Sequence, residues 1–304
     1  MWKHWAALLW PLSLTCLADN TIVGTGFGRN SDLAIAPGQI LRLDVRGIGA
    51  SLTGTVTASG YPWPTKLVGI SVTLHLHYSI FTTDVTDVSA PILSVERLPG
   101  CLNNNVFPTQ LVCTQITSVI VQIPYSVPVN GTAARLTVSE NGVPGNPVDI
   151  FAQKDAINAI AVLRSDWTIV SALNPADPGE NLALFAYGLG LVSPAVDAGQ
   201  PAPNQPAVVN GLFRLSYDVR YEAPPYRDAA NLLPEIQPTF VGLSPGVPGL
   251  YQINFQAPAV PAGNQGCPVI GGIIFSIVYH SNVTINLRGP HSFDGIGICV
   301  KPQS

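Results

Sequence analysis

Charge is the property that this sequence has least of. Only 11% of its 304 residues are charged, about half the share found in an average soluble protein. Lys and Arg are not clustered anywhere, and the net charge is −4 at pH 7. A groove that follows a phosphate backbone needs a basic surface, so the composition excludes a nucleic-acid partner.

A long apolar run is also missing. The apolar residues 5–17 form a run shorter than the ~20 residues that a membrane span needs, and no later run is long enough. This run follows the basic residue Lys3 and ends in small residues, which is the pattern of an export signal. We therefore expect residues 1–18 to be a signal peptide cleaved near Ala18, giving a secreted, periplasmic or cell-surface protein. Lipoprotein processing at Cys16 is the alternative.

Cysteine is scarce, and its spacing is informative. Four cysteines follow residue 18, and no C-x-x-C pair occurs among them, so the spacing does not favour a zinc site. Export permits disulfide bonds, and four cysteines allow three pairings. We favour Cys101–Cys113 together with Cys267–Cys299, because each bond then stays within one proposed domain.

Turn residues and β-forming residues are what the chain has in abundance. It contains 28 Gly and 28 Pro, with Val, Ile, Thr, Tyr, Phe and Trp spread between them. β-Forming residues interrupted so often by turn residues indicate many short strands. We therefore predict an all-β protein.

Two parts of the chain repeat each other. Residues 36–49 match residues 177–190 at a constant offset, and each segment has a Pro-Gly turn, a strand and a G-x-G corner. Residues 121–124 match residues 255–258. A repeat of this length corresponds to a whole domain rather than to a solenoid unit.

The repeat divides the chain. We predict two tandem immunoglobulin-like β-sandwich domains after the signal peptide, at residues 19–152 and 153–304. The corner glycines of both copies are expected to supply positive φ or a close approach of the backbone.

The clearest strand lies at residues 251–257. Its apolar residues alternate with Gln252, Asn254 and Gln256, which places an apolar row on one face and an amide row on the other. We expect the apolar row to form the core. The amide row is expected to be solvated or hydrogen-bonded across strands.

Several motifs in the second half resemble a known family. They are Asn174-Pro175, Pro178-Gly179-Glu180, Tyr187-Gly188-Leu189-Gly190, Val192-Ser193-Pro194 and the G-L-Y-Q-x-N-x-Q-x-P run at residues 249–258. In these motifs the half resembles an uncharacterised C-terminal β-sandwich domain family of secreted acidobacterial proteins. The first half would be a diverged copy.

This resemblance implies a fold and an exported setting, but no reaction. The residues that carry it and that we expect to define the fold are Gly188, Gly190, Tyr251, Gln252, Ile253, Asn254, Phe255 and Pro258. One departure from the family pattern is Trp167, which stands at a hairpin turn where the family usually has Gly.

No catalytic or cofactor site stands out. Residues 242–246 fit the G-x-S-x-G nucleophile elbow, but Pro245 follows the serine and has no N–H for an oxyanion hole. His75 and His77 share one strand face, a spacing that can hold a metal, yet no third ligand is evident. We therefore predict no catalytic residue, no metal and no cofactor.

Aromatic residues in loops give the best binding hypothesis. The candidates are Trp63, Trp167 and Tyr226, with Arg227 beside Tyr226 in the same loop. Trp167 lies at the turn of a hairpin that we prefer to a helix in residues 155–170. Rigid exposed aromatics at loop tips suit sugar or protein recognition, and the alternative is that they cap the ends of the two cores.

The leading functional hypothesis is a non-catalytic structural or adhesive protein of the cell surface or medium, whose partner is a protein or a polysaccharide. The second is a carbohydrate-binding module that uses the loop aromatics. The third is a hydrolase that uses His75 and His77 or an unassigned pair of acids.

Overall fold

Strands dominate the structure. A computed structural model describes residues 20–26, 34–77, 85–98, 102–103, 111–112, 116–129, 133–267, 269–271 and 277–304. Within these ranges the one helix is the short α1 (Ala229–Leu232). The prediction of an all-β protein is confirmed.

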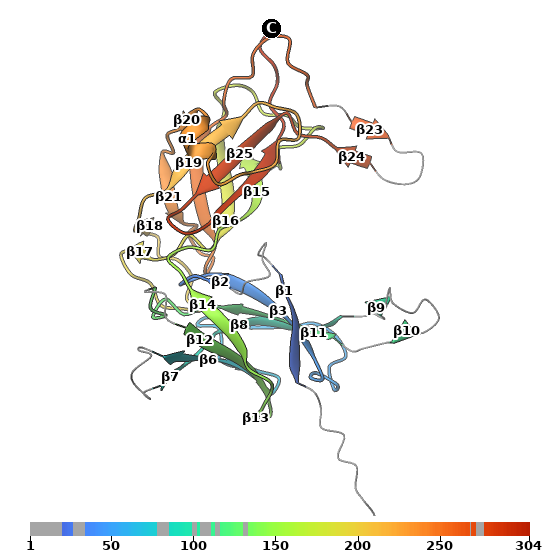
Figure 1. The fold of residues 1–304 in the computed structure, drawn as a ribbon, viewed down its shortest axis with the longest axis vertical. Coiled ribbons are helices and arrows are strands. Elements are labelled where there is room, and N and C mark those ends of the chain that lie inside the picture. Colours follow the sequence, from blue (N-terminus) through green and yellow to red (C-terminus); the bar gives the residue numbers. More distant parts are fainter. Residues whose placement is uncertain are drawn as a thin grey trace, which may run out of the picture.

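The first half forms two larger sheets around one core (Figure 1). The first sheet has the order β1 (Thr21–Gly26), β3 (Ile40–Arg46), β11 (Ile116–Gln122), β8 (Ile92–Leu98) and β4 (Val56–Thr57). The second has the order β2 (Ala34–Ile35), β14 (Val148–Ala152), β12 (Ala133–Glu140), β6 (Ile70–His77) and β5 (Lys66–Leu67), and β13 (Val143–Pro144) and β7 (Val85–Ser89) add to it. A separate ribbon pairs β9 (Leu102–Asn103) with β10 (Leu111–Val112).

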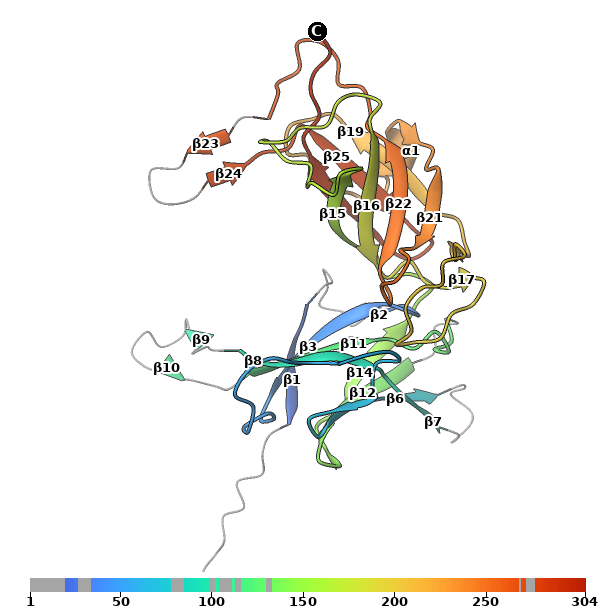
Figure 2. The ribbon, with the colours of Figure 1, turned by 180° about the vertical axis from the view of Figure 1, so that it is seen from behind.

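The second half repeats the two-sheet arrangement. One sheet has the order β15 (Asn158–Arg164), β16 (Asn181–Tyr187), β22 (Tyr251–Gln256), β21 (Phe240–Leu243), β18 (Val208–Val209) and β17 (Val192–Ser193). The other has the order β20 (Glu235–Ile236), β19 (Arg214–Asp218), β25 (Val283–Arg288) and β26 (Phe293–Ile298). β23 (Val269–Gly271) and β24 (Ile277–Tyr279) form a ribbon that projects from this half (Figure 2).

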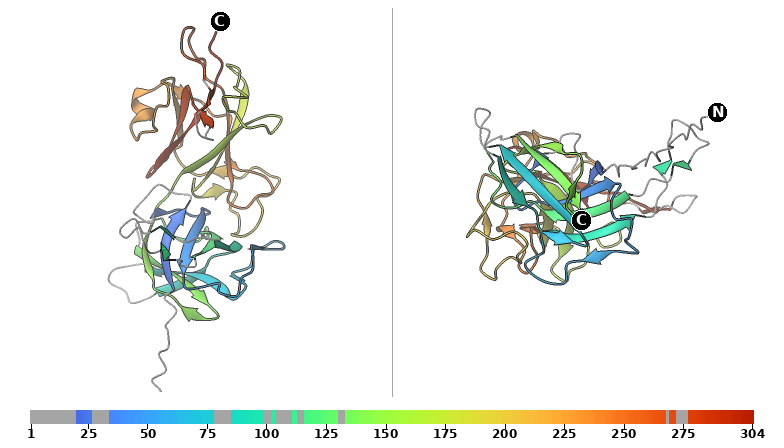
Figure 3. Two further views of the ribbon diagram at one scale, coloured as in Figure 1. Left: turned by 90° about the vertical axis from the view of Figure 1, so that its right-hand side faces the viewer. Right: turned by 90° about the horizontal axis from the view of Figure 1, so that it is seen from below.

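Each half has its own hydrophobic core. The buried residues of the first core run from Ile35 to Ala152, and those of the second run from Ile157 to Val300. The two halves lie one above the other along the long axis of the molecule (Figure 3). Tyr251, Ile253 and Phe255 are 0%, 0% and 1% exposed, which confirms that the apolar row of β22 is central to the second core.

The Pro-Gly turn occurs twice with the same geometry. Gly38 N–H donates to the Ile123 carbonyl over 2.9 Å, and Gly179 N–H donates to the Ala257 carbonyl over 2.9 Å. Both glycines have positive φ, as do the corner glycines of the two G-x-G motifs. A left-handed backbone at these turns requires glycine to avoid strain, so the conformational prediction for the repeated glycines is confirmed.

The strand pairing recurs as well. Gln122 in β11 pairs with Ile40 in β3, and Gln256 in β22 pairs with Asn181 in β16, at matching positions of the sequence repeat. The first strand of each half has a register shift after its second residue, between Ile22 and Gly24 in β1 and between Ala159 and Ala161 in β15. The two halves therefore share a turn, a strand pair and an irregular edge strand.

Gln122 joins the two halves. Its side chain is fully buried, whereas the matching Gln256 is exposed. The Gln122 amide oxygen accepts from Gly199 N–H over 2.6 Å, and its amide nitrogen donates to the Gly38 carbonyl over 3.3 Å. The Gly199 carbonyl in turn accepts a hydrogen bond from Trp63 N–H over 2.9 Å. These hydrogen bonds fix the second half against the repeated turn of the first.

Tyr125 and Gly249 complete this contact. Tyr125 packs against the core of the second half, and its buried hydroxyl lies beside Tyr251 and Gln122 without a hydrogen bond of normal geometry. A Cβ atom added at Gly249 would lie 2.7 Å from the Gly38 carbonyl oxygen. The backbones of the two halves are thus too close for any side chain at this position.

The buried tyrosines predict a loss of stability at high pH. Burial raises the pKa of Tyr125 to about 12 and the pKa of Tyr251 well above its usual value. A tyrosine in the unfolded chain loses its proton near pH 10, so the folded state binds more protons between pH 10 and about 12.

We therefore expect the free energy of unfolding to fall between pH 10 and 12 by about 1.4 kcal/mol per pH unit for each such tyrosine. Urea titrations across this range measure the slope. Tyr125→Phe should have a shallower slope than the wild type, and equal slopes would contradict this assignment.

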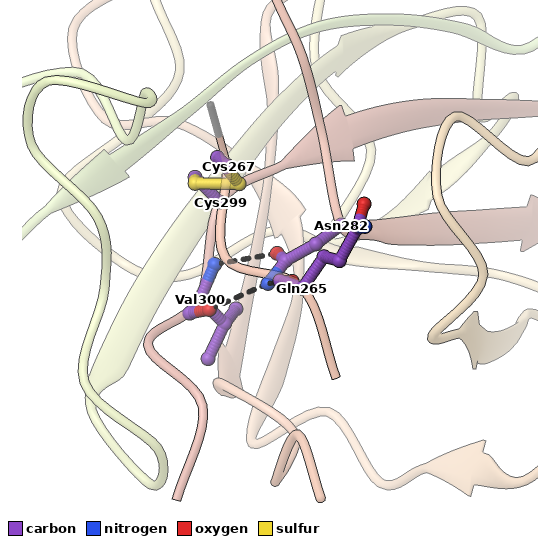
Figure 4. Close-up of a disulfide and its surroundings, with 5 residues drawn as sticks. All are labelled: Gln265, Cys267, Asn282, Cys299 and Val300. Carbon is purple, nitrogen blue, oxygen red and sulfur yellow. Dashed lines mark hydrogen bonds between the residues drawn. A yellow bond between two sulfur atoms is a disulfide. The ribbon is translucent and has the colours of Figure 1, made fainter. Parts of the chain in front are cut away.

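A disulfide bond joins Cys267 to Cys299, as predicted, with 5.9 Å between their Cα atoms. Next to it, the Asn282 side chain donates to the Val300 carbonyl over 2.8 Å and accepts from Val300 N–H over 3.0 Å (Figure 4). The loop before β23 and the chain after β26 are therefore attached to the same end of β25. Cys101 and Cys113 lie outside the described residues.

Breaking this disulfide should destabilise the second half. The bond closes a sequence separation of 32 residues, and a loop of this size corresponds to about 3–4 kcal/mol of chain entropy in the unfolded state. We expect Cys267→Ser/Cys299→Ser to melt well below the wild type in thermal denaturation. If the wild type and the double variant had the same thermal midpoint under oxidising conditions, the disulfide bond would not contribute to stability.

Candidate functional site

Trp167 is an exposed aromatic residue in an unusual backbone conformation. It lies in the hairpin that follows β15, with φ of 67°, and its side chain is 70% exposed. A bulky residue is rarely found in the left-handed region, and such strain is concentrated at functional sites. The indole stacks on Phe185 of β16, with 6.2 Å between the ring centres. The predicted hairpin is confirmed, and Trp167 is presented at its turn.

Hydrogen bonds hold this hairpin in one conformation. Arg164 N–H donates to the Thr168 carbonyl over 2.9 Å, and Trp167 N–H donates to the Arg164 carbonyl over 3.0 Å. The Asp166 carboxylate accepts from the backbone N–H of Thr168 over 3.0 Å and from its hydroxyl over 2.6 Å. The hydroxyl hydrogen bond is the largest cause that lowers the pKa of Asp166. The indole is therefore placed by a turn that is already ordered.

Arg164 anchors the base of the hairpin. Its guanidinium forms a bidentate ion pair with Glu180 at 2.7 and 2.9 Å and donates to the Asn174 side chain over 2.8 Å. Asp177 lies 3.8 Å from the same guanidinium and 2.7 Å from Lys301. The hydrogen bond from Lys301 is the main cause that lowers the pKa of Asp177. Bidentate pairing fixes the orientation of the arginine as well as its position.

A shallow groove of about 370 Å³ begins beside Trp167. It lies over β15, β16 and β22, which run side by side in Figure 2, and reaches the residue before β21. We call it the Trp167 groove. The residues that line it and matter here are Leu163, Trp167, Ala183, Thr239, Gln252 and Asn254.

Two of the three amides in the β22 row are therefore part of the groove. Gln252 and Asn254 are half-buried, and the Gln252 amide nitrogen donates to the Asn254 amide oxygen over 2.8 Å. Asn254 pairs across the sheet with Ala183, whose small side chain leaves room between the amides and Trp167. The groove thus offers one aromatic plane and a set of oriented amide groups.

The other predicted binding residues do not line this groove. Trp63 is only 7% exposed, so the expectation that it stands free at a loop tip is wrong. Its backbone bonds to Gly199 of the second half, and that contact covers the loop. Tyr226 is half-buried, and the exposed Arg227 donates to the His291 carbonyl over 3.3 Å.

The residues considered for catalysis have structural partners. Ser244 is 5% exposed and is followed by a turn and then by β22, where a nucleophile elbow would need a helix. The His75 ring contacts the Asp87 carboxylate at 2.7 Å and the Thr137 hydroxyl at 3.1 Å. The side chain of His77 lies outside the described residues. In the described ranges, no three His, Cys, Asp or Glu residues are grouped to hold a metal ion.

The signature residues have two roles. Tyr251, Ile253 and Phe255 are core residues, and Gly188 and Gly190 have φ of 76° and 89°. Pro258 is buried just beyond β22. The sequence did not point to Asn181, Ala183 or Thr239 as groove residues. Asn181 and Ala183 point outward on β16, which is the feature that could have identified them. That feature points to the groove only once β16 is known to pair with β22.

Comparisons with known proteins add little. No model of a known protein family matches the chain, and no curated protein matches it. One similar solved structure is the C-terminal domain of the Streptococcus agalactiae AgI/II polypeptide BspA, with 10% identity over 88% of this chain and 95% of that chain and a TM-score of 0.16. A second, described as BspA_C_mut, covers 88% and 93% at 9% identity with a TM-score of 0.17. TM-scores this low carry no argument about this chain.

Proposed function

We propose that this chain is an exported, non-catalytic binding protein that attaches to carbohydrate at the cell surface or in the medium through the Trp167 groove. The observation that carries the proposal is Trp167 itself, which is 70% exposed and held at φ of 67°. A flat aromatic face suits the apolar C–H face of a sugar ring. The Gln252 and Asn254 amides suit the hydroxyl groups at its edge, because hydroxyl and amide groups both donate and accept hydrogen bonds.

Export is supported by the disulfide Cys267–Cys299, because such bonds persist in oxidising compartments. The N-terminal signal remains a prediction from the sequence. No helix within the described ranges is long and apolar enough to cross a membrane.

A protein partner is the second candidate for the same hairpin. Ile169 and Leu173 are 61% and 68% exposed, and with Trp167 they place three apolar side chains on one loop. Apolar side chains gathered in this way are typical of protein interfaces. Ile169→Ser/Leu173→Ser should weaken an apolar protein contact and leave binding in the Trp167 groove unchanged.

Fluorescence titration tests the carbohydrate proposal. From Asp19 onward, Trp63 and Trp167 are the two tryptophans of the chain, and Trp63 is buried. Titration with cell-wall and plant polysaccharides should change the emission of the exposed Trp167. Trp167→Gly should show no such change. A panel of neutral and acidic polysaccharides that leaves the wild-type emission unaltered would refute the proposal.

A further inference from the structure

The Trp167 groove has almost no free charge. Among the described residues that line it, Arg164 is the one charged side chain. Both oxygens of the Glu180 carboxylate bind its guanidinium, at 2.7 and 2.9 Å. The arginine is 20% exposed and the glutamate 19%, so the pair is largely shielded from solvent. A cation held in this way is already matched by an anion and is a poor partner for a second one.

The charges around the hairpin oppose an anionic ligand. Asp166 directly precedes Trp167, and the guanidinium of Arg164 is near enough to attract its carboxylate. Among the described residues, the hydrogen bonds to this carboxylate come from the backbone and hydroxyl of Thr168. These are neutral donors that favour the ionised form without cancelling its charge. The ammonium group of Lys301 is paired with Asp177 at 2.7 Å. The surface beside the indole is therefore neutral or negative.

The polar groups that face a ligand are amides and hydroxyls. The Gln252–Asn254 hydrogen bond orients both amides, so that the Asn254 amide nitrogen keeps two N–H donors for other partners. Thr239 donates its hydroxyl proton to the Asn254 carbonyl over 3.3 Å, so its oxygen remains as an acceptor, and Ser165 adds a second hydroxyl at the same groove. These groups match the mixed donor and acceptor pattern of sugar hydroxyls, and a carboxylate or sulfate can only accept.

We infer that the groove selects uncharged glycans and rejects glycans that carry carboxylate or sulfate groups. The inference rests on the proposed carbohydrate function and adds its specificity. Its basis is the closed Arg164–Glu180 ion pair, the negative Asp166 and the neutral amides on the floor. Binding of a neutral glycan in such a groove should also be insensitive to salt, because no counterions are displaced.

Calorimetric titration with matched oligosaccharides tests this inference. The probes are a neutral hexamer such as a β-1,4-glucan or mannan and the corresponding uronate hexamer, each at about 50 and 500 mM NaCl. We expect the neutral probe to bind at least about tenfold more tightly than its uronate counterpart at low salt, with less than about a twofold change on adding salt. Tighter binding of the uronate would overturn the inference and leave the carbohydrate function standing. Binding of neither probe, or equal binding by Trp167→Gly, would overturn both.

Glu180→Gln provides a gain-of-function test. The substitution keeps an acceptor oxygen but releases the Arg164 charge, so binding of the uronate hexamer should strengthen at least about fivefold and become salt-sensitive. Glu235→Gln is the matched control, because it removes the same charge from an ion pair with Arg214 in the other sheet. Identical uronate affinities in the two variants would overturn the inference.

Asp177→Asn is the second variant if Glu180→Gln does not fold. It removes the other carboxylate near Arg164 and frees Lys301, and both changes occur at an exposed position. We expect a smaller gain in uronate binding, in the same direction. Uronate affinity of Asp177→Asn equal to or below that of the wild type would contradict the inference.

Discussion

Trp167→Gly should lose carbohydrate binding and keep the fold. An aromatic residue at the centre of a binding surface contributes at least about 2 kcal/mol, which corresponds to about a thirtyfold loss of affinity. Glycine accepts φ of 67° without strain. Relief of about 1–3 kcal/mol of strain offsets the lost stacking on Phe185, which is worth about 1 kcal/mol. The thermal midpoint should therefore stay near that of the wild type.

Trp167→Phe is the control for this substitution. It keeps an aromatic face at the same turn, so its affinity should lie between those of the wild type and the glycine variant. Calorimetry gives the affinities, and circular dichroism gives the thermal midpoints. If the glycine variant binds as tightly as the wild type, Trp167 does not contribute to the binding site.

Gly249→Ala should weaken the contact between the two halves and lower the free energy of unfolding. A Cβ atom there would lie 2.7 Å from the Gly38 carbonyl oxygen, 2.8 Å from Ile40 Cδ1 and 2.9 Å from the Gln122 amide nitrogen. The first of these neighbours is backbone and cannot move without opening the contact between the halves. We expect the free energy of unfolding to fall by about 2–4 kcal/mol.

Gly246→Ala is the matched control in the same loop. Gly246 also has positive φ, of 76° compared with 66° at Gly249, but a Cβ atom there would meet nothing within 4 Å. Gly246→Ala should lower the free energy of unfolding by the backbone strain alone, about 1 kcal/mol. Denaturant titrations of both variants measure the difference, and equal losses would show that the close approach at Gly249 has no energetic weight.

The sequence was sufficient to predict the parts of the fold that are governed by local patterns. The alternation in residues 251–257 predicted which side chains of β22 are buried, because a strand has a period of two. The repeated glycines predicted positive φ, because only glycine takes that conformation without strain. The immunoglobulin-like topology of the two halves and the resemblance to the acidobacterial domain family stay predictions.

Contacts between distant segments could not be predicted in the same way. Gln122 and Gln256 occupy matching positions of the repeat, yet one is buried and the other is exposed. The difference arises from the second half, which covers the turn of the first and leaves its own turn open. The exposure of Trp63 was predicted wrongly in a loop that also contacts the other half, where Trp63 N–H donates to the Gly199 carbonyl.

The candidate site was predicted in separate pieces. Trp167 and the amides of Gln252 and Asn254 each stood out in the sequence, and the amides were interpreted as a solvated or cross-strand hydrogen-bonded face. What joins them is the pairing of β15 with β16 and of β16 with β22, which brings residues about 85 positions apart to one groove. Sequence spacing alone contains no information on that pairing.

The central claim is that carbohydrate binds at Trp167 and the amides beside it. Nuclear magnetic resonance of isotope-labelled protein, titrated with a neutral oligosaccharide, tests this most directly. The side-chain N–H signals of Trp167, Gln252 and Asn254 should shift together with increasing ligand, and the indole signal of the buried Trp63 should remain in place. Shifts confined to other residues, or none at saturating oligosaccharide, would contradict the account.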